Sequence, residues 1–341
     1  MGTVAGQALD RRAVAPVLSL YGARLTDCPL ELYYNDTAAY VRGQAAIRST
    51  FDPDALFAPF ALASIGAAFG SELQYFADQA PNIKRPAIRS AQDWDHITMP
   101  DPDTHPRLLY FREAIRQMAA EHRGEVPIVG VMPAPTDLPA LIMGLEAWLE
   151  TMLFDPSRAR EIMAVTTPFF VELANDFFAD GATVIASPCA FVSPVFVTRE
   201  TVVSLSRPAL ETALSQLNGP LMLHHGGATI SAHLDLLTGL PSVIALALDQ
   251  KDDLATARAI LGPDLVLFGG PAGPTLNRLT AEEVQSVCLS MLVDRSDDTR
   301  FILYSCGPDI PWDTPVENIA ALCRSTLLPE GRPRCGAPVH V

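Results

Sequence analysis

The chain has 341 residues, of which 49% are hydrophobic and 18% are charged, so it can bury a large core. Its net charge of −15 argues against nucleic-acid binding, because neutralising phosphates requires a concentrated basic surface. We expect no membrane span, because no apolar run is long enough, and we expect no signal peptide, because residues 1–16 carry no basic cluster followed by an apolar core. The six cysteines have no repeated spacing, which is typical of reduced thiols, and we therefore expect a cytoplasmic protein.

Short apolar runs alternate with longer helical patterns along most of the chain. Eight runs predict strands, over residues 15–20, 55–60, 127–132, 183–187, 220–224, 242–248, 265–268 and 301–305. Continuously apolar strands that alternate with helices are typical of a parallel sheet covered on its outer side. Eight such units predict a closed (β/α)8 TIM barrel, with one domain over 1–341 and its core over 14–328.

The segments between these strands carry the helix patterns and one longer insertion. Helices are predicted over 136–152, 156–180, 198–217, 229–238, 254–261, 280–293 and 314–327. Between the second and third strands, residues 70–77 predict a further strand and residues 81–106 a proline-punctuated excursion, so we expect a hairpin and loop that cap the barrel. The tail, 329–341, is rich in proline and glycine and predicts little regular structure.

The active site of a (β/α)8 enzyme lies at the carboxyl ends of its strands, and this rule selects a small set of residues. They are Cys189 after the fourth strand, His224 and His225 after the fifth, Asp249 after the sixth and Cys306 after the eighth. Thiolates and imidazoles around one cavity form the ligand set of zinc. The glycine pairs Gly226-Gly227 and Gly269-Gly270 permit close backbone approach or a positive φ above the barrel, and they match no phosphate-binding loop.

Each candidate also has a structural interpretation. A cysteine near a strand end is more often a small buried apolar residue than a ligand. A histidine there is often a core imidazole with satisfied hydrogen bonds. Asp249 is also placed to cap a helix that begins near Leu254.

Six segments of the chain resemble the uroporphyrinogen decarboxylase superfamily, which includes a methyltransferase branch. The similar segments are residues 51–76, 129–163, 180–194, 220–227, 267–271 and 304–322. The last segment, YSCGPDIPWDTPVENIAAL, is the most specific because it is similar to the final strand and helix of the family. The resemblance implies the same (β/α)8 barrel that the strand count predicts.

Two positions separate the branches of the superfamily that the chain resembles. Decarboxylase members carry an arginine-rich first loop and an aspartate at the end of the second strand, which orients the pyrroles of the substrate. Here Arg24 is the one candidate arginine, and Pro59 stands where the aspartate is expected. The resemblance is therefore closer to the methylcobalamin:thiol methyltransferases, such as those that methylate coenzyme M.

The methyltransferase branch implies a zinc ion that lowers the pKa of the acceptor thiol, held by a His-x-Cys after the fifth strand and a cysteine after the eighth. His224 and Cys306 match these ligands, whereas Gly226 takes the place of the middle cysteine. Three alternatives follow: Cys189, or else His225, supplies the third ligand; the metal is lost and His224 or His225 is a general base; or the protein binds a corrinoid or tetrapyrrole without catalysis.

The sequence thus predicts a methyltransferase that moves a methyl group between methylcobalamin, free or on a corrinoid protein, and a thiol or other small acceptor, assisted by zinc on His224, Cys306 and Cys189. His225 is the predicted base, and Asp249 the carboxylate that fixes an imidazole tautomer. The four glycines of the two pairs are predicted to leave room for a flat macrocycle. The alternatives are porphyrinogen decarboxylation and corrinoid binding without catalysis.

Overall fold

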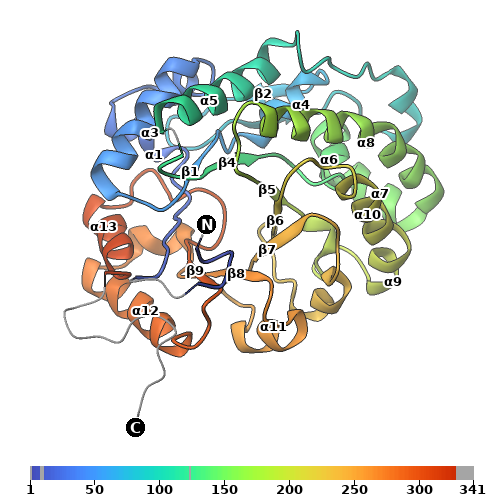
Figure 1. The fold of residues 1–341 in the computed structure, drawn as a ribbon. Coiled ribbons are helices and arrows are strands. Elements are labelled where there is room, and N and C mark those ends of the chain that lie inside the picture. The colour runs from blue at the N-terminus through green and yellow to red at the C-terminus, as the bar shows by residue number, and fades with distance from the viewer. Residues whose placement is uncertain (1, 8–10, 123, 328–341) are drawn as a thin grey trace.

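A seven-stranded parallel sheet forms the centre of the protein in the computed structural model, which describes residues 2–7, 11–122 and 124–327. The strand order is β1-β4-β5-β6-β7-β8-β9, and the sheet curls so that helices cover its outer side (Figure 1). The strands are β1 (Leu56–Phe57), β4 (Ile128–Val131), β5 (Val184–Pro188), β6 (Leu221–His224), β7 (Val243–Ala247), β8 (Val266–Gly269) and β9 (Phe301–Leu303). Seven of the predicted strands are therefore confirmed.

The predicted first strand, 15–20, is not a strand, and this prediction was wrong. One isolated bridge joins Val14 to Leu303 of β9, and the Asp54 N–H donates to the Val14 carbonyl at 2.9 Å on the other side. Beyond Val14, side chains replace the ladder, because the Val17 N–H donates to the Ser305 hydroxyl at 2.9 Å. A backbone bonded to side chains cannot continue a strand, so this segment adds one bridge to a curled seven-stranded sheet.

The helices after β4 follow the predicted pattern with local breaks, whereas the helices before β4 were not predicted. The helices are α1 (Tyr21–Leu25), α2 (Leu30–Tyr33), α3 (Thr37–Phe51), α4 (Leu62–Ala68), α5 (Pro106–His122), α6 (Leu138–Met143), α7 (Leu145–Phe154), α8 (Pro156–Ala179), α9 (Arg199–Thr201), α10 (Arg207–Leu214), α11 (Leu254–Leu261), α12 (Ala281–Asp294) and α13 (Val316–Arg324). Gly144, at φ +89°, divides the predicted 136–152 helix into α6 and α7. The predicted 229–238 helix is the 3₁₀ segment Ser231–Leu237.

The predicted hairpin between the second and third predicted strands is present. Its strands, β2 (Glu72–Gln74) and β3 (Asn82–Arg85), pair antiparallel. The predicted tail, 329–341, lies outside the described residues.

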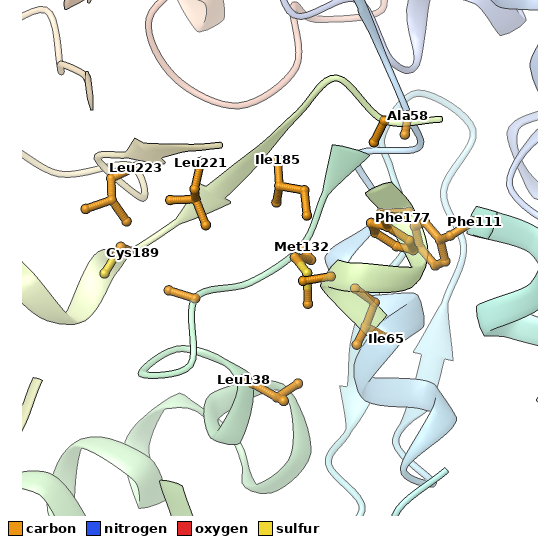
Figure 2. Close-up of a cluster of buried hydrophobic side chains, with 14 of the residues drawn as sticks. Ala58, Ile65, Phe111, Met132, Leu138, Phe177, Ile185, Cys189, Leu221 and Leu223 are labelled. Carbon is orange, nitrogen blue, oxygen red and sulfur yellow. The ribbon is translucent and has the colours of Figure 1, made fainter. Parts of the chain in front are cut away.

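Apolar side chains form two layers, one on each face of the sheet, because successive residues of a strand point to opposite faces. Ile185, Leu221 and Leu223 pack outward against the helices (Figure 2), whereas Met222 packs with the strand residues that face the interior. The helix α8 is long and apolar enough to cross a membrane by length and composition, but half of its apolar window is buried in this structure. Such burial is that of a core helix, which makes α8 weak evidence for a membrane span.

A cavity of about 260 Å³ opens at the amino ends of the strands. Its mainly apolar wall includes Val129, Met222 and Ile302, which face the interior of the curled sheet, and Val4, which covers the amino ends of the strands. The predicted site residues follow the opposite ends of the strands. In barrels of this kind the amino end serves stability, and the carboxyl end carries the chemistry.

Candidate active site

Two stacked histidines at the end of β6 form the centre of the candidate site. His224 and His225 are buried, and their ring centroids lie 4.2 Å apart at an interplanar angle of 24°. His224 follows Met222 by two residues, so its side chain points to the interior of the curled sheet. The structure therefore places the pair at the carboxyl end of a central strand.

Hydrogen bonds on both ring nitrogens fix the tautomer of His224. Its Nδ1 accepts the Gly226 N–H at 3.0 Å, so the ring proton is on Nε2. Nε2 lies 2.6 Å from the Tyr304 hydroxyl oxygen and 3.1 Å from the Gly307 carbonyl oxygen. The Tyr304 hydroxyl donates to that carbonyl at 3.1 Å, which leaves its oxygen free to accept from His224. His224 and Tyr304 together hold the Gly307 carbonyl.

His225 holds the other side of the same peptide. Its Nε2 accepts the Gly307 N–H at 3.2 Å, and its Nδ1 lies 3.1 Å from the Gly227 backbone nitrogen. A neutral imidazole accepts at one nitrogen only, and the Asp249 carboxylate, 3.7 Å from Nδ1, favours a proton on Nδ1. Asp249 is too far from Nδ1 for a hydrogen bond, so it favours this tautomer of His225 through its negative charge alone. It does not cap the helix α11, because that cap is Asp253, which accepts the Thr256 N–H at 2.7 Å.

Burial keeps the two imidazoles and the thiol of this site uncharged. Burial and the neighbouring His225 hold the pKa of His224 well below its ordinary value, and burial lowers the pKa of His225 to about 4. The Cys306 thiol donates to the Gly270 carbonyl at 3.1 Å, and burial raises its pKa to about 12. At neutral pH the site therefore contains two neutral imidazoles and a protonated thiol.

The chain itself fills the space in front of three of the four site glycines. A Cβ on Gly226, whose φ is +67°, would lie 2.6 Å from the Ala190 nitrogen, and one on Gly270 would lie 1.5 Å from the Tyr304 carbonyl oxygen. A Cβ on Gly269 would meet the Leu254 side chain at 2.9 Å. Gly227 is the exception, because nothing lies within 4 Å of its Cβ position. The first three glycines allow close packing of the protein and do not open room for a macrocycle.

Cys189 lies away from the histidine nitrogens. It belongs to the outer apolar layer, with Leu223 and Leu138 (Figure 2), and its thiol lies 3.5 Å from the Thr136 hydroxyl. Burial raises the pKa of this thiol well above its ordinary value. Its backbone N–H donates to the His224 carbonyl at 2.9 Å, so the link from Cys189 to His224 runs through the backbone and not through a shared ligand site.

The donors present do not fit the zinc site that the sequence resemblance implies. No three His, Cys, Asp or Glu side chains within 2–7, 11–122 and 124–327 are grouped so that they could hold a metal ion. Both ring nitrogens of His224 and the Nε2 of His225 already have hydrogen-bond partners, and a cysteine side chain at position 226 would collide with Ala190. The predicted set of His224, Cys306 and Cys189 is therefore not assembled in this structure.

Several polar residues of the site were not found by the sequence reasoning. They are Tyr304, Asp137, Asp252 and Asp309. Asp252 accepts from the backbone of Ile230 and Ser231 and so holds the loop that follows the histidines. Asp309 is buried, and its Oδ2 accepts the Leu20 N–H at 2.8 Å. The alternation of β9 was the available signal for Tyr304, because Ile302, two residues earlier, also faces the interior.

Replacing Tyr304 by phenylalanine tests the clamp on Gly307. The variant removes one hydroxyl from a buried network and leaves the His224 Nε2–H with the Gly307 carbonyl alone. We expect the free energy of unfolding to fall by about 1–2 kcal/mol in chemical denaturation. An unchanged denaturation midpoint would contradict the clamp. The variant Tyr75→Phe is a control, because the Tyr75 hydroxyl contacts the exposed Asn35.

A comparison with known proteins identifies the family. The sequence profile described as "Uroporphyrinogen decarboxylase (URO-D)" matches residues 1–326. The chain belongs to the uroporphyrinogen decarboxylase family. It is 25% identical over 283 residues to "Uroporphyrinogen decarboxylase" of Psychromonas ingrahamii, covering 79% of this chain and 77% of that protein. It is 23% identical over 269 residues to "Methylated-thiol--coenzyme M methyltransferase" of Methanosarcina mazei, covering 76% and 69%.

Solved structures support the fold of this family member. A structure described as "methyltransferase from Methanosarcina mazei" matches with a TM-score of 0.85 at 19% identity, covering 95% of this chain and 96% of that chain. A B12-independent methionine synthase from Shewanella matches with a TM-score of 0.55 at 13% identity, covering 92% and 95%. The resemblance stated from the sequence is confirmed, and the relatives include both methyltransferases and decarboxylases.

Proposed function

We propose that this protein is a methyltransferase that moves a methyl group between a methylated corrinoid, free or bound to a corrinoid protein, and a thiol or other small acceptor. The observation that carries the proposal is the uncharged, hydrogen-bonded cluster of His224, His225, Tyr304 and Gly307 at the carboxyl ends of β6 and β9. The similarity to the methyltransferases from Methanosarcina supports it. A cytoplasmic location and closure of the barrel through the isolated bridge between Val14 and Leu303 belong to the same proposal.

Two features of the structure favour methyl transfer over decarboxylation of a porphyrinogen. Pro59 is buried just beyond β1, where an acidic side chain would be needed to stabilise a cationic pyrrole. The Arg24 guanidinium donates to the Trp312 and Thr314 carbonyls, so it is engaged by the protein and not presented to a carboxylated substrate. A substrate with many carboxylates would thus lack both its counter-charge and its arginine contacts.

The proposed chemistry uses His225 as a general base. Burial lowers the pKa of His225 to about 4, so the imidazole is neutral in the physiological range, and its Nε2 takes up a proton once the substrate displaces the Gly307 N–H. The imidazole takes the proton from the acceptor thiol or hydroxyl as that atom attacks the methyl carbon. The bond between the methyl group and its donor breaks, and the electron pair stays on the donor. Because the donor set does not fit zinc, no step is assigned to a metal.

Gly227 is the proposed point of substrate approach. It adjoins the Gly226 position that Ala190 closes, and the space beside its own Cβ position is empty. A methyl donor at Gly227 would lie next to His225, because the Gly227 backbone nitrogen is 3.1 Å from the His225 ring. Asp249 would stabilise the imidazolium formed when the base takes the proton.

The test is the loss of methylcobalamin under anoxic conditions, followed by absorbance, with a panel of small thiols and a folate as acceptors. We expect acceptor-dependent demethylation that falls about 10²–10⁴-fold in His225→Gln. Gly239→Ala is a control variant outside the site, at a glycine whose φ of +69° is similar to that of Gly226. Tight cobalamin binding without transfer would identify a corrinoid-binding protein. Release of CO₂ from uroporphyrinogen, with no demethylation, would establish decarboxylation instead.

A further inference from the structure

We propose that Asp137 is a positioning residue that locks Ala190 against Gly226 and thereby commits the two histidines to the Gly307 peptide instead of to a metal ion. Asp137 accepts the Ala190 N–H at 2.6 Å, across 53 residues of sequence. Ala190 in turn occupies the space that a side chain on residue 226 would need. This inference concerns the ligand set alone, so it holds whether the family member transfers methyl groups or removes carboxylates.

The position of Asp137 in its own helix shows how its side chain is used. Asp137 stands at the N-cap of α6, where an aspartate ordinarily accepts a backbone N–H of the first turn. Here the side chain makes no cap hydrogen bond and bonds instead to Ala190 and to the Thr136 hydroxyl, the latter at 2.8 Å. The helix gives up a cap worth about 1 kcal/mol, and the carboxylate fixes the loop after β5.

The carboxylate is itself held in place by the core. The Thr136 carbonyl accepts the Trp148 indole N–H at 2.8 Å, and Trp148 is completely buried. The residue before Ala190 is also anchored, because the Cys189 N–H donates to the His224 carbonyl at 2.9 Å and so fixes the position of Ala190 along β6. Two anchors, one on α7 and one on β6, therefore leave Ala190 little freedom to move.

The closed position determines what the histidines can bind. With Ala190 against it, Gly226 adopts φ +67° and donates its N–H to His224 Nδ1. His224 Nε2 then faces Tyr304 and the Gly307 carbonyl, and His225 Nε2 faces the Gly307 N–H. A metal ion would need one of these nitrogens without its partner and a third donor near residue 226. The contact of Ala190 with Gly226 leaves neither a free ring nitrogen nor a third donor.

The experiment combines elemental analysis with nuclear magnetic resonance of histidine-labelled and glycine-labelled protein. For the wild type, purified without chelators, we expect no stoichiometric zinc and a His224 ring whose Nδ1 carries no proton. In Asp137→Ala we expect the Gly226 amide to exchange with solvent about tenfold faster, because the hydrogen bond that positions Ala190 is lost. Asp137→Asn retains an oxygen for the Ala190 N–H and should keep the wild-type exchange rate.

A matched control separates positioning from general destabilisation. Asp155 caps α8 by accepting the Arg158 N–H at 3.1 Å, so Asp155→Ala removes an N-cap carboxylate without touching the site. It should lose stability and leave the Gly226 exchange rate and the histidine ring shifts unchanged. Near-stoichiometric zinc in the wild type that falls in both Cys306→Ala and His224→Ala would overturn the proposal. This outcome requires no folded Asp137 variant, and it would leave the assay of methyl transfer to be judged separately.

Discussion

Gly226→Cys, which restores the cysteine of the related zinc sites, is expected to destabilise the protein by roughly 2–5 kcal/mol and to add no zinc. Two costs contribute to this loss. A side chain at φ +67° is strained by about 1–2 kcal/mol, and its Cβ would lie 2.6 Å from the Ala190 nitrogen, an overlap that adds about 1–3 kcal/mol. The side chain would thus enter a position that Ala190, in the segment after β5, already occupies.

A control at matched backbone geometry isolates the steric part of this effect. Gly239 has φ +69°, and nothing lies within 4 Å of its Cβ position. Gly239→Cys should therefore show the backbone strain alone, about 1–2 kcal/mol. Chemical denaturation of both variants, with elemental analysis of each, gives the comparison. Equal losses at the two positions, or zinc gained by Gly226→Cys alone, would contradict the closed position that we describe.

Most of the strands could be predicted from the sequence, and the first could not, for a reason found in side chains. Buried parallel strands carry apolar side chains on both faces, so runs such as 220–224 are visible without any partner. The 15–20 run is similarly apolar, but two serine hydroxyls bind backbone N–H groups that a strand ladder would use. Ser305 accepts the Val17 N–H, and Ser19 accepts the Phe60 N–H at 2.8 Å. Ser19 lies within the run, but its partner Phe60 and the hydroxyl of Ser305 come from distant parts of the chain, and no local pattern reveals these pairings.

The site was predicted where strand alternation and chain order suffice. His224 and Cys306 both face the interior of the sheet or lie at its end, as expected from the strands that carry them. Cys189 lies an odd number of residues from Ala186, which faces the interior, and the two side chains therefore belong to opposite layers. Its placement among the ligands was an error of register.

The closure at Gly226 could not be read from the sequence at all. It depends on the approach of Ala190, which follows a different strand, and on the distant carboxylate of Asp137. A glycine in place of a cysteine indicates only that a ligand is missing. Whether the vacated volume stays open for another donor or is filled by the chain depends on packing between elements, and here the chain fills it.

The stability of the protein is expected to fall in acid partly because of His225. Its pKa is lowered from 6.5 to about 4 by burial, so the folded state binds the proton less well than the unfolded chain. The contribution of neutral His225 is therefore fully present above pH 6.5 and is lost as the pH falls through about 4. A difference of this size corresponds to roughly 3 kcal/mol at its limit.

The measurement is the free energy of unfolding of wild type and His225→Gln across this pH window. Glutamine does not titrate there, and it can still accept the Gly307 N–H, so the gap between the two proteins should narrow by roughly 3 kcal/mol between pH 7 and pH 4. Asn318→Ala serves as the control, because it removes a buried amide that bonds to the Leu276 and Leu279 carbonyls and introduces no titrating group. Its offset from wild type should stay constant with pH. If the difference in free energy of unfolding between wild type and His225→Gln were also constant with pH, the imidazole would not be the source of the acid sensitivity. This difference varies with pH only when a group binds its proton with different affinity in the folded and unfolded states.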